Sequence, residues 1–139
     1  EARVRARGSV GRGIGWKEKG KDGARVTDVA GAYTRATGAD PFRLPDSGLK
    51  AKASLDLSTP FDFVTDNDII GGNAGSPVID RDGHAIGLIF DGNIHSLGGD
   101  FTFDSSVNRA VAVDSAALLE SVRKVYHLPE LAKELEGKQ

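Results

Sequence analysis

Hydrophobic and polar residues alternate most clearly in the middle of the chain. Residues 55–66, LDLSTPFDFVTD, predict a strand at the edge of a sheet, because Pro60 interrupts the alternation. Residues 78–93, VIDRDGHAIGLIFDGN, hold two apolar runs around an Asp-Gly turn, which predicts a β-hairpin. Residues 100–114 predict a further strand pair, with its bend near Ser105.

The N-terminal third has weaker patterns. Residues 1–16 alternate small or apolar residues with arginine, and their glycines are typical of a bent or bulged strand. Residues 17–24 predict a polar turn, and residues 25–39 predict a strand followed by a short helix that Gly38 would end. Residues 40–48 contain two prolines, which predicts an extended connection rather than a regular element.

The C-terminal end changes to a helical period. Asp114 or Ser115 can cap a helix, and Pro129 can begin a second one. The apolar residues that fall on one face of the first helix are Leu118, Leu119, Val122, Val125 and Tyr126. We therefore expect a mainly antiparallel β portion, residues 1–114, with a C-terminal helical cap, residues 115–139.

Composition limits the classes of function. A chain of 139 residues that is 39% hydrophobic suits one compact domain, and its net charge of −2 argues against binding to nucleic acid. We interpret Arg3, Arg5 and Arg7 as a solvated strand face. No cysteine is present, which excludes a disulfide framework and a thiolate metal site, and no apolar run approaches the ~18 residues of a membrane span. Methionine is absent even at position 1, so we expect a processed, excised or engineered product.

Residues 71–78, GGNAGSPV, have the form of a serine nucleophile turn. A nucleophilic serine projects from a tight turn whose backbone N–H groups face the developing oxyanion, and glycines let that backbone approach the substrate. Here alanine, Ala74, stands at the position where a serine is expected. Ser76 lies directly before Pro77, so its hydroxyl would leave from a different point of the turn.

The string around this turn is more specific than the turn itself. Residues 67–93, NDIIGGNAGSPVIDRDGHAIGLIFDGN, follow LDLSTPFDFVT and precede NRAVAVDSAALLESVRKVY. Together they closely resemble the C-terminal part of the bacterial dipeptidyl-peptidase 7 and 11 family of serine exopeptidases, over about residues 33–135. The resemblance implies a chymotrypsin-like double β-barrel, of which this chain would be the second barrel with its C-terminal α-helices. We expect no metal and no cofactor.

The resemblance assigns roles within the turn. Family members read GGNSGSP, and the serine that is their nucleophile matches Ala74. Gly72 and Ala74 would supply the N–H groups of the oxyanion hole, with Asn73 and Gly75 shaping the turn between and after them. Because these donors belong to the backbone, the loss of the serine side chain would leave them in place.

The catalytic base is missing from the part of the chain where the resemblance expects it. In the family the histidine and aspartate lie far upstream of the serine, and no histidine precedes Ala74. We interpret His84, His95 and His127 as exposed turn, loop and helix-end residues. The chain is therefore not expected to be a complete enzyme.

The resemblance also indicates a substrate preference. The position of Gly92 lines the specificity pocket in the family, where glycine accompanies hydrophobic and arginine accompanies acidic substrates. Asp91 matches a position near the α-amino group of a peptide with a free N-terminus, although both residues also suit an ordinary strand-end turn. We interpret Asp68 as structural. We interpret Asp80 and Asp82 as turn residues rather than calcium ligands.

Three hypotheses follow. The chain is the C-terminal portion of a dipeptidyl-peptidase whose nucleophile was deliberately replaced, which we favour; or a natural non-catalytic relative that binds peptides; or an ordinary β domain with a misleading turn. On the first we expect the chain to associate with the missing N-terminal half or with a second copy of itself as a homo-oligomer. The resemblance implies the periplasm or the cell surface as its location.

Overall fold

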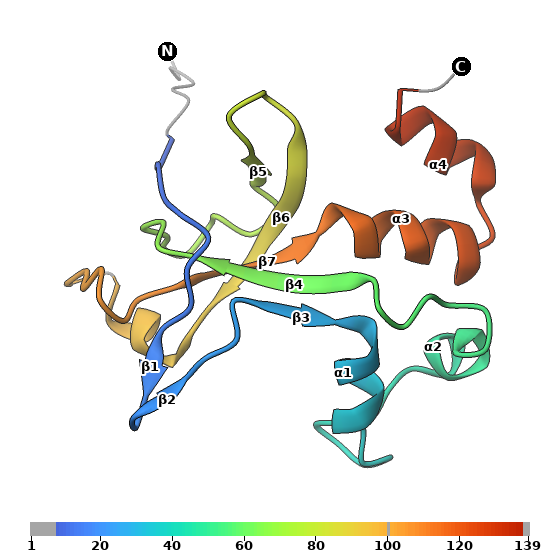
Figure 1. The fold of residues 1–139 in the computed structure, drawn as a ribbon, viewed down its shortest axis with the longest axis horizontal. Helices are drawn as coiled ribbons and strands as arrows, with labels where there is room; N and C mark the ends of the chain where they lie inside the picture. Colours follow the sequence, from blue (N-terminus) through green and yellow to red (C-terminus); the bar gives the residue numbers. More distant parts are fainter. Residues whose placement is uncertain (1–7, 100, 138–139) are drawn as a thin grey trace.

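A five-stranded antiparallel sheet forms the centre of the molecule in a computed structural model that describes residues 8–99 and 101–137 (Figure 1). The strand order is β3-β4-β7-β6-β5. The bounds are Val26–Asp28 for β3, Pro60–Thr65 for β4, Pro77–Ile79 for β5, Ala85–Gly92 for β6 and Ala110–Asp114 for β7. The expectation of a mainly antiparallel β fold with C-terminal helices is confirmed.

The core lies where β4, β7 and β6 meet. Phe63 of β4 and Ile89 of β6 both pair with Ala112 of β7, and together with Ala110 these residues form the buried cluster. Both alanines are completely buried, because the larger side chains of the neighbouring strands fill the space beside them. Gly87 completes this packing, since a β-carbon there would lie 2.6 Å from the ring of Phe63.

The prediction that residues 55–66 form an edge strand is wrong. β4 lies inside the sheet, between β3 and β7. Pro60 does not prevent this, because it is the first residue of the strand and pairs with Asp28 at the end of β3.

The predicted hairpin of residues 78–93 is confirmed by the antiparallel pairing of β5 with β6. The second predicted strand pair is half wrong, because among residues 101–114 only Ala110–Asp114 is a strand. In the preceding segment the Asp104 carboxylate accepts hydrogen bonds from the amide and the hydroxyl of Ser106, and this local turn replaces the strand.

The start of the chain is largely irregular. The arginines of residues 1–7 lie outside the described residues, and residues 8–16 contain a single β-bridge, from Gly13 to Thr65, instead of the predicted bulged strand. The predicted polar turn of residues 17–24 is a small hairpin of β1 (Lys17–Glu18) and β2 (Lys21–Asp22).

Two short helices follow β3. α1 (Val29–Arg35) begins where the Asp28 side chain accepts a hydrogen bond from the amide of Gly31 at 2.8 Å, and it ends before Gly38 as predicted. α2 (Asp46–Ala51) was not predicted. Its N-terminal boundary is Pro45, so the proline that indicated an extended connection instead precedes a helix.

The C-terminal helices agree with the sequence. α3 (Ser115–Lys124) is capped by the Asp114 carboxylate, and Pro129 begins α4 (Pro129–Leu135). α3 contacts β4, β6 and β7 as well as α4. The division into a β portion and a helical cap at residue 114 stays a prediction.

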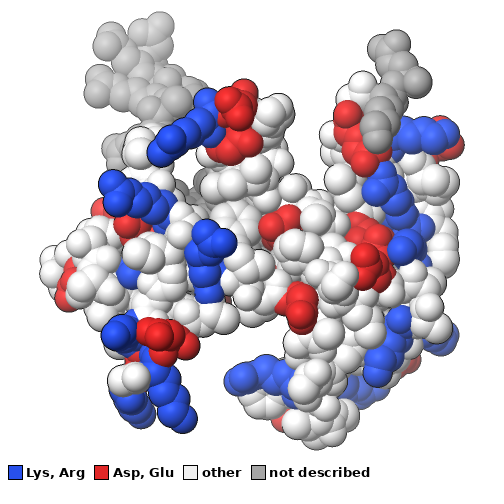
Figure 2. All heavy atoms as spheres, viewed as in Figure 1, with Lys and Arg blue, Asp and Glu red and all other residues white. Residues whose placement is uncertain are grey.

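Basic and acidic side chains are interspersed on the face shown in Figure 2. On α3 and α4 three basic residues pair with glutamates: Arg123 with Glu136, Lys124 with Glu120 and Lys133 with Glu130. Within residues 8–99 and 101–137, no helix has both the length and the apolar character that crossing a membrane requires.

Candidate active site

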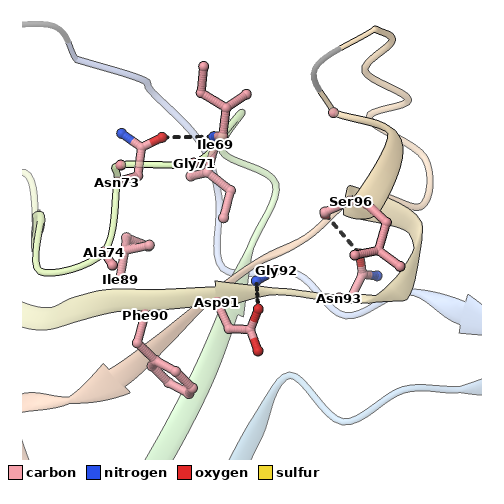
Figure 3. A pocket seen from close by; sticks show the side chains of 14 residues that line it. Ile69, Gly71, Asn73, Ala74, Ile89, Phe90, Asp91, Gly92, Asn93 and Ser96 are labelled. Atoms are coloured by element: carbon pink, nitrogen blue, oxygen red, sulfur yellow. Dashed lines mark hydrogen bonds between the residues drawn. The ribbon is translucent and has the colours of Figure 1, made fainter.

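The turn that carries Ala74 is built by two glycines and an asparagine. Gly72 has φ +96° and Gly75 has φ +85°, values that side chains disfavour. Between them the Asn73 side chain closes the turn, because its Oδ1 accepts a hydrogen bond from the amide of Ile70 at 2.8 Å (Figure 3). The amide of Asn73 in turn donates to the Ile70 carbonyl at 3.2 Å.

Backbone hydrogen bonds attach this turn to β6. The amide of Gly75 donates to the carbonyl of Ile89 at 2.7 Å, and the amide of Ile89 donates to the carbonyl of Ser76 at 2.9 Å. Because both bonds reach the same central strand, the position of Ala74 is set relative to the buried core.

The amides of Gly72 and Ala74 are left unpaired. Within the described part of the chain neither amide has a hydrogen-bond acceptor, although Asn73, Gly75 and Ser76 all donate to backbone carbonyls. Two unpaired amides separated by a single residue in a left-handed turn suit an anion such as the oxyanion of acyl transfer.

Both residues line a cleft of about 290 Å³ (Figure 3). One wall is the segment of residues 69–74. The other wall combines the end of β6 with the short 3₁₀ helix η1 (Ile94–Gly98), which follows it directly. Ser76 is not part of the lining, and its backbone is paired with Asn73 and Ile89. That Ser76 is not a nucleophile stays a prediction.

The structure brings Asp91 and Gly92 to the same cleft as Ala74. A β-bulge between Ile89 and Asp91 interrupts the pairing of β6 with β7. In the view of Figure 3, the Asp91 carboxylate and Ala74 lie on opposite sides of the β6 ribbon. One carboxylate oxygen of Asp91 accepts a hydrogen bond from the amide of Gly92 at 2.8 Å.

None of the three histidines lines the cleft. His84 Nδ1 lies 3.1 Å from Asp80 Oδ2 in the β5–β6 turn, and His127 borders a separate hollow between α2 and α3. Among the described residues that line the cleft there is therefore no imidazole.

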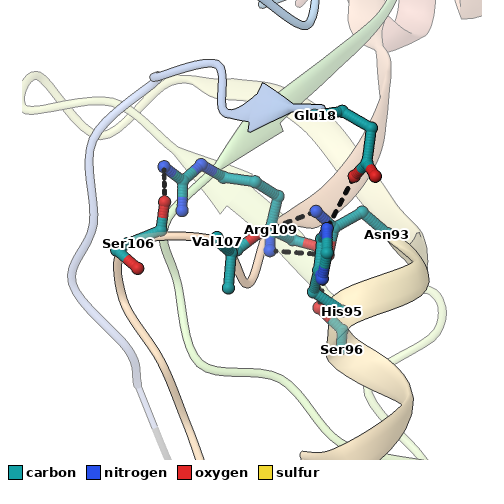
Figure 4. A network of polar contacts seen from close by, with 7 residues as sticks. All are labelled: Glu18, Asn93, His95, Ser96, Ser106, Val107 and Arg109. Atoms are coloured by element: carbon teal, nitrogen blue, oxygen red, sulfur yellow. Dashed lines mark hydrogen bonds and ion pairs between the residues drawn. The ribbon is translucent and has the colours of Figure 1, made fainter. Parts of the chain in front are cut away.

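The interpretation of His95 as an exposed loop residue is wrong. Its side chain is one-third exposed, and its Nε2 lies 2.7 Å from Oε2 of Glu18, which joins η1 to β1 (Figure 4). This hydrogen bond lowers the pKa of Glu18 below its usual value. Loop position in the sequence could not reveal a partner 77 residues away.

The acidic residues near the hairpin behave as turn residues. The Asp80 carboxylate accepts hydrogen bonds from the amides of Asp82 and His84, both at 2.9 Å, and the bond from His84 is the main cause of a lowered Asp80 pKa. Possible ligand atoms of these three residues lie within 4.8 Å of one another. Asp68 is exposed and lies outside the cleft lining.

A polar network behind the cleft was missed from the sequence (Figure 4). Arg109 is 4% exposed, and the partners of its guanidinium among the described residues are all backbone carbonyls, which belong to Ile14, Gly15, Ser105, Ser106 and Asn108. Its backbone amide and carbonyl bond to the side chains of Asn93 and Ser96 respectively. A single arginine in a polar loop gives no sequence signal for such burial.

The family model described as Peptidase S46 matches residues 2–137. The chain belongs to the peptidase S46 family. It is 46% identical over 94 residues to Dipeptidyl-peptidase 7 of Phocaeicola vulgatus, which covers 68% of this chain and 13% of that enzyme. It is 39% identical over 79 residues to the Asp/Glu-specific dipeptidyl-peptidase of Shewanella putrefaciens, which covers 57% of this chain and 11% of that enzyme.

The fold of this S46 chain also matches a solved structure. The crystal structure of Porphyromonas endodontalis DPP11 in complex with the dipeptide Arg-Glu aligns with a TM-score of 0.83 and 23% identity, over 94% of this chain and 20% of that one. The predicted resemblance to the dipeptidyl-peptidase 7 and 11 family is confirmed, and the alignment fits the barrel portion of the fold. The hypothesis of an ordinary β domain is therefore wrong. The chain spans about one-fifth or less of these relatives.

Proposed function

We propose that this chain is the C-terminal, nucleophile-bearing portion of a serine dipeptidyl-peptidase that releases N-terminal dipeptides with a hydrophobic second residue. The observation that carries the proposal is the pair of unpaired amides, Gly72 and Ala74, at a cleft that also contains Gly92. A serine hydroxyl at position 74 would leave from the same turn that offers these donors.

The chemistry assigned to the turn is acyl transfer. The oxygen of a serine at position 74 would attack the carbonyl carbon of the second peptide bond, and the proton of that hydroxyl would pass to a base. The amides of Gly72 and Ala74 would donate to the carbonyl oxygen as it becomes negative. The base and the group that orients it would come from the missing N-terminal half of the protease.

The electrostatics of the cleft favour a hydrophobic substrate side chain. Asp91 is the only charged residue among the described residues that line the cleft, and no lysine or arginine is among them. A substrate carboxylate there would lose water without gaining a positive partner. The apolar part of the lining comes from Ile69, Ile70, Ile89, Phe90 and Leu97.

Asp91 is the proposed partner of the substrate amino group. Its carboxylate is exposed, and one oxygen stays available after the other accepts the bond from Gly92. A carboxylate and an ammonium form a charge-assisted hydrogen bond, which would select peptides with a free N-terminus.

The chain as it stands is proposed to be inactive, because Ala74 has no hydroxyl to attack the substrate. The same feature favours a second candidate function, a module that binds peptides without cutting them. For both candidates we propose a periplasmic or cell-surface location, as the resemblance implies.

The test is to restore the nucleophile. The full-length protein that contains this chain, with Ala74→Ser, should release dipeptides from chromogenic substrates whose second residue is leucine or phenylalanine. We expect activity at least about 10⁴-fold above the Ala74 protein, because the nucleophile is indispensable. Substrates with aspartate in second place should be poor. Tight peptide binding with no release from the Ala74→Ser protein would instead establish the binding module.

A further inference from the structure

The space beside Gly92 is already filled by Ser96. A β-carbon added to Gly92 would lie 2.8 Å from Cβ and 3.2 Å from Oγ of Ser96, and contacts below 3.0 Å are essentially never made by real β-carbons. Residue 92 therefore cannot carry a side chain unless Ser96 moves. Gly92 and Ser96 therefore form one steric unit, in which Ser96 occupies the space that a side chain at position 92 would need.

Ser96 is held firmly in this place. Its amide donates to the Asn93 carbonyl at 2.9 Å, and its hydroxyl lies 3.0 Å from Oδ1 of Asn93 and 3.2 Å from the carbonyl of Arg109 (Figures 3 and 4). Asn93 is itself buried, and its side-chain amide donates to the Val107 carbonyl at 2.7 Å. Because these partners are buried backbone and amide groups, Ser96 resists displacement by a ligand.

The hydrogen bonds of Ser96 also fix its polarity toward the cleft. A serine hydroxyl has one proton, and here both acceptors of that proton belong to the protein. The hydroxyl oxygen can therefore offer only lone pairs to a ligand. These lone pairs repel a carboxylate. An apolar group can lie beside them without cost, because the Ser96 hydroxyl keeps its hydrogen bond to the protein.

We propose that Ser96 is a specificity-determining residue for the substrate side chain that enters the cleft at Gly92. Ser96 limits the depth of the cleft at this end, and its lone pairs disfavour acidic side chains. The inference deepens the proposed function and depends on it for the identity of the ligand. Selectivity for the substrate side chain then depends on Ser96 as well as on Gly92.

The experiment compares substrates within one enzyme sample. In the full-length Ala74→Ser protein, kcat/KM is measured for dipeptide substrates with phenylalanine or valine in second place. Ser96→Gly removes both clashing atoms, so it should raise the phenylalanine-to-valine ratio about tenfold, the usual effect of one added methylene of space. The ratio does not depend on the folded fraction, so reduced stability alone would not change it.

Two control variants distinguish an effect on the depth of the cleft from a general effect on folding. Ser96→Ala keeps the β-carbon, so it should leave the phenylalanine-to-valine ratio within about twofold. Ser58→Gly makes the same exchange in an exposed loop outside the cleft, where the hydroxyl bonds to Asp56, and it should leave the ratio unchanged. An unchanged ratio in Ser96→Gly would overturn the proposal.

A rescue experiment tests the steric unit directly. Gly92→Ala should lower kcat/KM for phenylalanine about tenfold, and Ser96→Gly added to it should restore most of that loss. Additive losses in the double variant would overturn the proposal.

Failure of the proposed function has a different result. If the Ala74→Ser protein releases no dipeptide from any substrate, the four variants at positions 92 and 96 are compared by urea unfolding of the same full-length protein. Gly92→Ala should then lower the unfolding midpoint, and Ser96→Gly should restore it. Independent effects at the two positions would show that Ser96 does not control the space beside Gly92.

Discussion

At Gly72 the backbone adopts φ +96°, and a β-carbon there would meet open space. The glycine is needed for its dihedral angle and not for room. Gly71, its neighbour, would also meet open space but does not have a left-handed φ. The two adjacent glycines therefore differ in backbone strain alone, because a β-carbon would clash at neither position.

This difference gives a prediction for the turn. Gly72→Ala should reduce the free energy of unfolding by about 1–2 kcal/mol, because an L-residue is disfavoured in this conformation. Gly71→Ala should change it by less than about 0.5 kcal/mol, as surface substitutions usually do. Urea unfolding followed by circular dichroism measures both. Equal losses in the two variants would contradict a left-handed turn at Gly72.

Single residues differ in how far the sequence could predict them. Ala74, Gly92 and Asp91 were predicted as site residues, and the structure brings them to one cleft because the turn and β6 are close in sequence and hydrogen-bonded to each other. Ser96 and Arg109 were missed. Their partners are backbone carbonyls and buried amides, which leave no pattern in the sequence.

Strand β4 carries a partly buried acidic residue, Asp62, whose burial is unfavourable to its charged form. Asp62 lies within this interior strand and pairs with Val113 of β7. Within the described part of the chain its carboxylate has no hydrogen-bond partner, although its backbone bonds to the Thr27 hydroxyl. Burial raises the pKa of Asp62 above its usual value.

The raised pKa predicts how stability depends on pH. The folded chain binds the Asp62 proton more tightly than the unfolded chain, so the cost of ionising Asp62 appears as the pH rises through the unfolded value of about 3.9. It is fully present above the raised folded pKa. Asp62→Asn should therefore increase stability at pH 7 by less than about 1 kcal/mol, because the residue is only partly buried and solvent screens its charge.

Unfolding curves of Asp62→Asn between pH 3 and pH 7 test this expectation. The gain should shrink as the pH falls through about 4 and be nearly absent at pH 3, where Asp62 is mostly protonated in both states. A gain of the same size at pH 3 and pH 7 would show that the carboxylate charge is not its cause.

Elements defined by local chemistry could be predicted from the sequence. The β5–β6 hairpin has its Asp-Gly turn, α3 has its Asp114 cap, and α4 has Pro129 at its first turn. Elements defined by distant pairing could not. The interior position of β4 depends on β3 and β7, and the segment before β7 follows the Asp104 turn instead of its apolar pattern.

At the scale of the whole molecule, apolar side chains remain exposed around the cleft. Ile94, Leu97 and Phe101 are 68%, 80% and 95% exposed. Leu97 lines the cleft itself. Since this chain covers only 20% of the matched DPP11 chain, the missing portion of the protease is the expected cover for this surface.

The exposed surface predicts association. The isolated 139-residue chain should form dimers or larger species in static light scattering, and Leu97→Ser with Phe101→Ser should shift it toward the monomer. Tyr126→Ser offers a matched control, because this residue is 65% exposed just after the C-terminal end of α3. A well-behaved monomer in the unsubstituted chain would contradict the prediction.

The central claim is that the turn of residues 71–77 presents position 74, and no other, to acyl chemistry. A fluorophosphonate probe tests it most directly, since it forms a bond to an activated serine oxygen with loss of fluoride. The full-length Ala74→Ser protein is treated with the probe and digested, and the labelled residue is located by mass spectrometry. The account predicts a label on residue 74 and none in the Ala74 protein. A label on Ser76, or no label on residue 74, would contradict it.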